Sequence, residues 1–154
     1  MGIDMWSLGC ILAELHSGHP IFPGENEHEQ LICIMEIFGV PPANILELSK
    51  RKKLFFDASN EPKIIMNSRG RKRKISSRQL NVAVKSNDQL FLDFLEKCFE
   101  WDPEKRLKPH EAMEHPFITE SLSKENSKAP SPAELPSIKK SSSDKVRVGS
   151  LFRK

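Results

Sequence analysis

The sequence has no apolar run that approaches the roughly 18 residues needed to cross a membrane, and it lacks a basic start followed by an apolar stretch, the pattern of a signal peptide. Only three of its 154 residues are cysteine, and this odd number argues against a disulfide framework. Cys10, Cys33 and Cys98 each lie in an apolar helical pattern. We therefore expect a soluble intracellular protein with buried thiols, located in the cytoplasm, the nucleus or both.

Lys and Arg are absent from residues 1–49, although the chain has a formal net charge of +3. Residues 50–85 hold twelve basic and two acidic residues, and residues 123–154 are also basic on balance. Residues 1–49 and 86–122 are both acidic on balance. The chain thus divides into two acidic blocks, a basic insert between them and a basic tail.

Apolar periodicity predicts an all-α fold of four or five helices. Asp4 is placed to cap a first helix that runs to about Ser17. Between Met5 and Leu15 only Ser7 and Glu14 are strongly polar. A helix that is apolar on nearly every side belongs inside a larger protein, so we expect part of its usual surroundings to be missing.

The later helices have amphipathic patterns with clear stop signals. The second ends at Gly39, and its acidic residues Glu27, Glu29 and Glu36 are expected to face solvent. A short amphipathic stretch at Ala43 to Arg51 follows. Asp88 is placed to cap a helix with a buried apolar stripe, and Pro109 to open a last short helix.

Two segments lack this periodicity. Residues 52–87 read as a long insert, with a short strand near Lys63 to Met66. After Phe117 the sequence turns to Ser, Lys and Pro, which predicts a disordered tail over 123–154 because such a composition buries little apolar area.

Three motifs give the strongest functional signal. They are Asp4-Met5-Trp6-Ser7-Leu8-Gly9, Trp101-Asp102-Pro103-Glu104-Lys105-Arg106 and His115-Pro116-Phe117. In this order and spacing they resemble the C-terminal half of the helical lobe of a eukaryotic protein kinase. The resemblance covers residues 1–122, as a partial kinase domain.

Further segments are similar to the CMGC group of kinases, and within it to the dual-specificity tyrosine-phosphorylation-regulated kinases. These segments are Pro23-Gly24-Glu25-Asn26-Glu27, Glu29-Gln30-Leu31, Gly39-Val40-Pro41-Pro42 and Ser49-Lys50-Arg51. Residues 67–73 and 91–95 most resemble the fourth-numbered member of that family.

The resemblance implies a parent enzyme that uses ATP and magnesium to phosphorylate Ser and Thr in proteins and tyrosine in its own chain. Phosphoryl transfer needs a Gly-rich loop, an H-R-D base and a D-F-G metal ligand, and these 154 residues contain none of them. Met1 would fall about ten residues after the expected A-P-E motif. We therefore expect a truncated, inactive chain with no catalytic, cofactor-binding or metal-binding residue of its own.

The resemblance also implies structural residues of the lobe, namely Asp4, Trp6, Gly9, Trp101, Asp102, Pro103 and Arg106. In the family, the aspartate matching Asp4 accepts hydrogen bonds from the catalytic loop, and the arginine matching Arg106 pairs with the A-P-E glutamate. Because neither segment is in this sequence, we expect a plain helix cap and a surface arginine here. Glu14 matches a glutamate that binds a substrate arginine in some kinases; the alternative, an ordinary surface glutamate, is the favoured interpretation for this chain alone.

The basic run Arg69, Arg71, Lys72, Arg73 and Lys74 is best interpreted as a solvated loop, with nuclear import as the second interpretation. No aromatic residue interleaves it, so binding of nucleic acid through base stacking has no support. Ser76 and Ser77, just downstream, and Ser131 before Pro132 are candidate phosphorylation sites. His110 and His115 are five residues apart and do not predict a metal site.

Three interpretations remain open at this point. The chain is a truncated kinase, a non-catalytic interaction module derived from one, or, more remotely, a basic nucleic-acid-binding helical module. In the first two, its partners are protein substrates or docking proteins. Because its first helix would be partly uncovered, we expect the isolated chain to self-associate or to bind chaperones.

Overall fold

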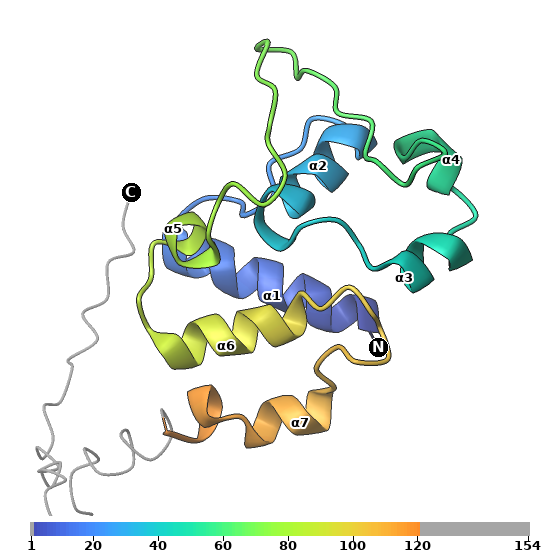
Figure 1. Cartoon of the computed structure of the whole chain (residues 1–154). Coiled ribbons are helices and arrows are strands. Elements are labelled where there is room, and N and C mark those ends of the chain that lie inside the picture. The colour runs from blue at the N-terminus through green and yellow to red at the C-terminus, as the bar shows by residue number, and fades with distance from the viewer. Residues whose placement is uncertain (1, 121–154) are drawn as a thin grey trace, which may run out of the picture.

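The computed structural model describes residues 2–120, which fold entirely as helices and connecting loops (Figure 1), and this confirms the all-α prediction. The described helices are α1 (Gly2–Ser17), α2 (Glu27–Phe38), α3 (Ala43–Leu48), α4 (Lys52–Phe55), α5 (Leu80–Val84), α6 (Gln89–Cys98) and α7 (Pro109–Glu114). Residues 116–120 add one more helical turn. Four or five helices were predicted; α3 lies in the amphipathic stretch predicted at 43–51, and the short α4 and α5 were not predicted.

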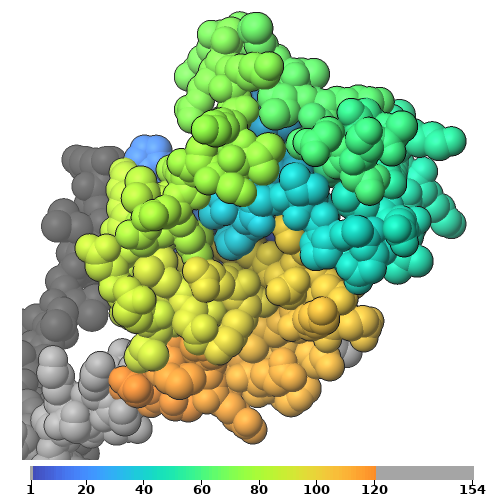
Figure 2. All heavy atoms as spheres, in the orientation of Figure 1, coloured from blue at the N-terminus to red at the C-terminus, as the bar shows by residue number. Residues whose placement is uncertain are grey.

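Helices α1 and α6 lie side by side at the centre of the molecule, and α5 crosses near one end of α1 (Figure 1). Helix α7 lies on the far side of α6. Helices α2, α3 and α4 form a layer on the other side, with the loop between α4 and α5 extending beyond them. In the space-filling view this loop, coloured green, projects from the body of the molecule (Figure 2).

Buried side chains from α1, α2, α5 and α6 join in one main cluster. Phe99, only 1% exposed, lies at its centre, with ring centroids of Trp6 and Phe22 each 5.2 Å from its own. A second cluster joins α1, α6 and α7, and a third joins α2 to the segment that holds α3 and α4. The insert is thus packed on the helical body through apolar contacts of its own.

Gly9 sets how closely α1 approaches α6. A Cβ atom at this position would lie 2.9 Å from the Cβ of Cys98 and 3.0 Å from the ring of Phe99. Because both neighbours are themselves buried, they have little space into which to move.

We expect Gly9→Ala to destabilise the protein by about 1–3 kcal/mol, the usual cost of overpacking a core. This cost should exceed the roughly 1 kcal/mol that alanine gains over glycine in helix propensity. Thermal melts of Gly9→Ala and of the wild type would measure this loss of stability. Ser7→Ala is the control, because Ser7 is an exposed residue of the same helix. A Gly9→Ala melting temperature at or above that of the wild type would contradict the close-approach argument.

An apolar strip runs along the uncovered side of α1. Ile3, Ile11 and Leu15 are 75%, 56% and 77% exposed, and they recur at multiples of four residues, which places them on one side of the helix. We call these three residues the α1 strip.

The observed helix boundaries confirm one predicted N-cap and contradict another. Helix α1 begins at Gly2, so Asp4 lies in its first turn and does not cap it. Asp88 caps α6 as predicted, because its Oδ1 accepts hydrogen bonds from the amides of Leu90 and Phe91. Asn26 caps α2 in the same way, its Oδ1 accepting from the amide of Glu29 at 3.0 Å.

The strand predicted near Lys63 to Met66 is wrong. Within residues 2–120 the only β-type pairing is an isolated antiparallel bridge between Phe56 and Pro62, because no second extended segment lies alongside to continue it. The insert also holds α4 and α5. Met1, residues 121–122 and the predicted tail over 123–154 lie outside the described residues. No helix among those described is long and apolar enough to cross a bilayer.

Candidate functional site: two arginine-centred clusters

The first cluster forms where Arg106 reaches back to the start of α1. Its Nε donates to the carbonyl oxygen of Glu100 at 2.8 Å, its Nη1 to that of Gly2 at 2.8 Å, and its Nη2 to that of Trp101 at 3.2 Å. The guanidinium lies 5.1 Å from the ring centroid of Trp6, within cation–π range. The prediction of a surface arginine is therefore wrong, because backbone carbonyls satisfy this side chain in a half-buried position.

Burial lowers the pKa of Arg106 from its usual value, while the nearby Glu100 carboxylate opposes that shift. An arginine stays protonated despite such a shift, because its usual pKa is so high. The cation therefore remains, held mainly by carbonyl dipoles. Arg106 thus ties the turn after α6 to the first turn of α1.

The other motif residues surround this arginine. The ring of Trp6 lies 5.9 Å from that of Trp101, measured between centroids. The carbonyl of Asp102 accepts the amide of Arg106 at 2.9 Å, and its carboxylate accepts the amide of Glu104, which shapes the turn that presents the arginine. The structure thus brings the first two sequence motifs together, although about 90 residues separate them.

Asp4 and Glu14 are both exposed on α1, unlike the partly buried residues of this cluster. Glu14 lies in the last turns of the helix. Burial is the main reason why the pKa of the Cys10 thiol is raised, and the charge of Glu14 adds to the effect. Their predicted roles toward a catalytic loop and a substrate arginine stay predictions.

The second cluster links α2 to the basic run. Glu29 and Glu36 are only 3% and 4% exposed. Arg73 lies between them, with its Nη1 at 2.6 Å from Glu36 Oε2 and its Nη2 at 3.5 Å from Glu29 Oε1. Arg71 adds a contact from its Nη2 to Glu36 Oε1 at 3.1 Å. Two buried carboxylates are therefore neutralised by cations from a segment more than thirty residues away.

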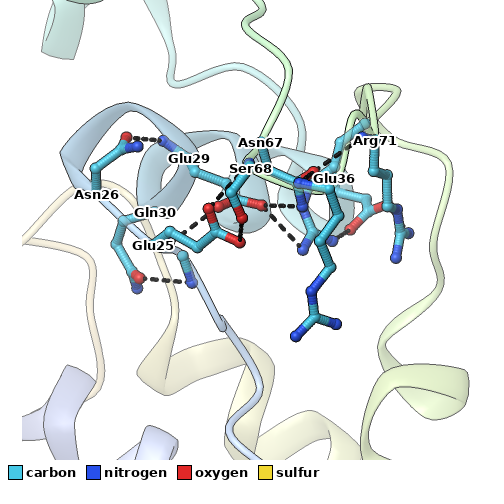
Figure 3. A network of polar contacts seen from close by, with 11 residues as sticks. Glu25, Asn26, Glu29, Gln30, Glu36, Asn67, Ser68 and Arg71 are labelled. Carbon is cyan, nitrogen blue, oxygen red and sulfur yellow. Dashed lines mark hydrogen bonds and ion pairs between the residues drawn. The ribbon is translucent and has the colours of Figure 1, made fainter.

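Polar side chains extend this network to the tip of the loop (Figure 3). Asn67 donates from Nδ2 to Glu29 Oε1 at 3.0 Å. The carboxylate of Glu25 accepts both the amide of Ser68, at 3.0 Å, and its hydroxyl, at 2.6 Å. Hydrogen bonds hold Glu29 in place, above all from the backbone amide of Glu25, and they lower the pKa of its carboxyl. We call residues 67–73 the docked loop.

This geometry corrects two predictions. Glu29 and Glu36 do not face solvent, and the basic run is not uniformly solvated, because Arg73 is buried. Glu29 and Glu36 are seven residues apart, so they share one face of α2. That spacing, together with a basic run in the insert, is the signal that could have revealed the pairing.

The basic run is divided by the structure. Arg69, Arg71, Lys72 and Lys74 are exposed, while Arg73 points inward. A polyanion could therefore contact all five basic residues only if the docked loop left α2. This argues against the nucleic-acid interpretation for the loop as it is docked here.

The third motif closes the far end of the lobe. His115 is buried, its Nδ1 accepts the amide of Phe117, and its Nε2 lies 2.9 Å from Asp93 Oδ2. Lys97 and, to a smaller extent, His115 hold the pKa of the Asp93 carboxyl below its usual value. The histidine thus has a structural place between α6 and α7.

The three cysteines are free thiols; Cys33 and Cys98 are buried as predicted, while Cys10 is only half-buried. Burial raises the pKa of Cys98 to about 11. Within residues 2–120, no group of three or more His, Cys, Asp or Glu side chains is placed to hold a metal ion.

The helical lobe and the meeting of its motifs at Arg106 agree with comparisons to known proteins. Residues 1–118 match the protein kinase domain family, and the chain belongs to that family. Within it, the chain is a partial domain similar to the dual-specificity tyrosine-phosphorylation-regulated kinases of the CMGC group, as the sequence motifs predicted.

Three curated relatives illustrate this similarity. Dual specificity tyrosine-phosphorylation-regulated kinase 2 of Drosophila melanogaster is 52% identical over 121 residues, and kinase 4 of Homo sapiens is 50% identical over 121 residues. Each alignment covers 79% of this chain, but only 17% and 23% of those relatives. The DYRK-family kinase pom1 of Schizosaccharomyces pombe is 48% identical over 76% of this chain and 11% of its own length.

Proposed function

We propose that this chain supplies the C-terminal half of the helical lobe of a dual-specificity protein kinase. The complete domain would transfer the γ-phosphate of ATP to Ser and Thr hydroxyls of protein substrates and to a tyrosine of its own chain. The observation that carries the proposal is the α1 strip, three large aliphatic side chains exposed on the central helix. Covering each of them would contribute about 1–2 kcal/mol, so this face is suited to packing against the remainder of a lobe.

The chain's contribution to the reaction is positional. ATP and magnesium would be held by a Gly-rich loop, a lysine and two aspartates, and none of those motifs occurs in these 154 residues. Helix α1 would support the catalytic loop through Asp4, which lies in its exposed first turn. The exposed Glu14 would bind an arginine of a protein substrate through a charge-assisted hydrogen bond.

The location and partners belong to the same proposal. The protein would act in the cytoplasm, the nucleus or both, on protein substrates and docking proteins. The exposed Arg69, Lys72 and Lys74 support a role in nuclear import, which needs accessible cations. The burial of Arg73 would limit that role while the loop is docked.

A chimeric enzyme tests the proposal. Residues 1–118 would replace the matching segment of human dual specificity tyrosine-phosphorylation-regulated kinase 4, and phosphate transfer to a protein substrate would be measured. We expect the chimera to be active and the 154-residue chain alone to bind no Mg-ATP by calorimetry. A folded but inactive chimera, or one-site micromolar nucleotide binding by the chain alone, would refute the proposal.

The α1 strip also predicts the behaviour of the isolated chain. We expect wild-type protein to self-associate, and the double variant Ile11→Glu/Leu15→Glu to be monomeric by size-exclusion chromatography with light scattering. In the chimera the same double variant should abolish activity, because charges would be buried in the lobe interior.

Leu48→Glu is the matched control, because Leu48 is 81% exposed on α3, away from the strip. It should change neither association nor chimera activity. A monomeric wild-type chain with a cooperative melt would favour the second candidate function, an independent non-catalytic interaction module, over the partial lobe.

A further inference from the structure

The sequence directs attention to Ser76 and Ser77 as phosphorylation sites, but the structure points to a different serine. We propose that Ser68 is a phosphorylation site for a protein kinase that selects serine followed by basic residues. We further propose that the phosphate detaches the tip of the docked loop, residues 67–71, from α2.

Ser68 is exposed at the tip of the loop, and only the exposed Glu25 holds its side chain. Residues 63–67 before it form a loop without regular secondary structure, and Met66 within that loop is 67% exposed. Arg69 and Lys72, one and four positions after the serine, are exposed as well. To bind this serine in an extended segment, an enzyme has to break its two surface hydrogen bonds to Glu25 and open the turn in which Asn67 accepts the amides of Gly70 and Arg71.

The rival serines are less available. The Ser76 amide donates to the carbonyl of Met35 at 3.0 Å, at the end of α2, and Arg73, three residues before it, is buried. The Ser77 hydroxyl donates to the Lys74 carbonyl at 2.6 Å. The next residue, Arg78, is fixed through its amide to the Glu36 carbonyl. Among the basic residues around these serines, Arg73 and Arg78 are thus held by the fold.

The modification requires ATP and a second protein kinase. The Ser68 Oγ would attack the γ-phosphorus of ATP, and the bond from that phosphorus to the bridging β,γ-oxygen would break to release ADP. The hydroxyl proton would pass to the carboxylate base of that kinase. The product carries a phosphate group with a charge of about −1.5 to −2 at neutral pH.

This phosphate would oppose the contacts that Ser68 makes with Glu25 and that Arg71 makes with Glu36. It replaces the hydroxyl that donates to Glu25 Oε1 at 2.6 Å, and it places a second anion beside that carboxylate. It would also attract the exposed Arg71 away from Glu36, because a phosphate binds arginine strongly. Arg73 stays buried between two carboxylates, so the base of the docked loop remains in place while its tip is released.

The test uses the full 154-residue chain, ATP and a purified kinase of basic-directed specificity. Phosphopeptide mapping should place most of the phosphate on Ser68, and Ser68→Ala should remove it. In the phosphorylated chain, the Ser68 amide should exchange hydrogen about tenfold faster or more, because its hydrogen bond to the Glu25 carboxylate is lost. The Ser76 and Arg78 amides, bonded to the end of α2, should stay within about twofold.

The Glu25→Gln variant distinguishes charge repulsion between the phosphate and Glu25 from the steric effect of the phosphate. Its side chain can still accept from Ser68 but carries no charge, so phosphorylation should speed exchange at the tip less than in wild type. Phosphate mainly on Ser76 or Ser77 would overturn the assignment of the site. Unchanged or slower exchange of the Ser68 amide after phosphorylation would overturn the release.

Discussion

Arg73→Ala should lower the free energy of unfolding by about 3 kcal/mol, because it leaves Glu36 and Glu29 buried without their main cation. The loss arises mostly from stranding charge in a site with little access to water. Urea denaturation would measure it in the Ile11→Glu/Leu15→Glu background, which is expected to keep the chain monomeric.

Arg71→Ala is the matched control, since Arg71 also contacts Glu36 but its side chain is 59% exposed. Exposed ion pairs contribute about 0–1 kcal/mol, so this variant should be nearly neutral. Equal losses in the two variants would show that burial of Arg73 is not the source of its effect.

The stability that Glu29 contributes should decrease at acidic pH. The folded-state pKa of Glu29 is below its usual 4.5, so its contribution to stability is complete above that value. The contribution is lost as the pH falls further, through the lowered folded-state pKa. Arg73→Ala should weaken this acid sensitivity, because Arg73 is one of the groups that lower the Glu29 pKa.

Arg106→Ala should lower the free energy of unfolding by about 3 kcal/mol, because three charge-assisted hydrogen bonds and the contact with Trp6 are lost together. Arg106→Lys should recover only part of this, since an ammonium group cannot reach three separated carbonyls with a planar fork. Both tryptophans of the chain lie at this site, so their fluorescence reports its opening directly.

Lys105→Ala serves as the control for Arg106. Lys105 is the preceding residue in the same turn, its side chain is 74% exposed, and its contact with Asp102 is 3.9 Å long. It should leave both the denaturation midpoint and the fluorescence unchanged. If Arg106→Ala behaves like Lys105→Ala, the arginine does not join the two motifs energetically.

Local sequence signals predicted the features of the fold that are set by residues within one helical turn. Asp88 caps α6 and Pro109 opens α7 because each needs only residues within one helical turn. The family motifs predicted the lobe because their spacing is specific. Asp4 was misplaced as a cap because the helix extends two residues further toward the N-terminus, to Gly2, whose carbonyl accepts a hydrogen bond from Arg106 Nη1.

The docked loop could not be predicted in this way. Periodicity alone treats every glutamate as a solvent-facing residue, and so it places Glu29 and Glu36 outside. Their burial depends on Arg73, which reaches them only after the chain has passed through α3 and α4. The same long-range pairing makes Ser68 notable, since nothing in its immediate sequence indicates contact with Glu25.

The docking of the basic run on α2 changes the electric field of the molecule. Along the sequence, an acidic segment is followed by a strongly basic one, which suggests a large charge separation. In space, Glu36 and Glu29 lie within 3.5 Å of the guanidinium groups that oppose them. Opposite charges this close appear nearly neutral beyond about 10 Å at moderate salt. The folded insert should therefore attract distant polyanions more weakly, and with a shallower salt dependence, than a free peptide of the same residues.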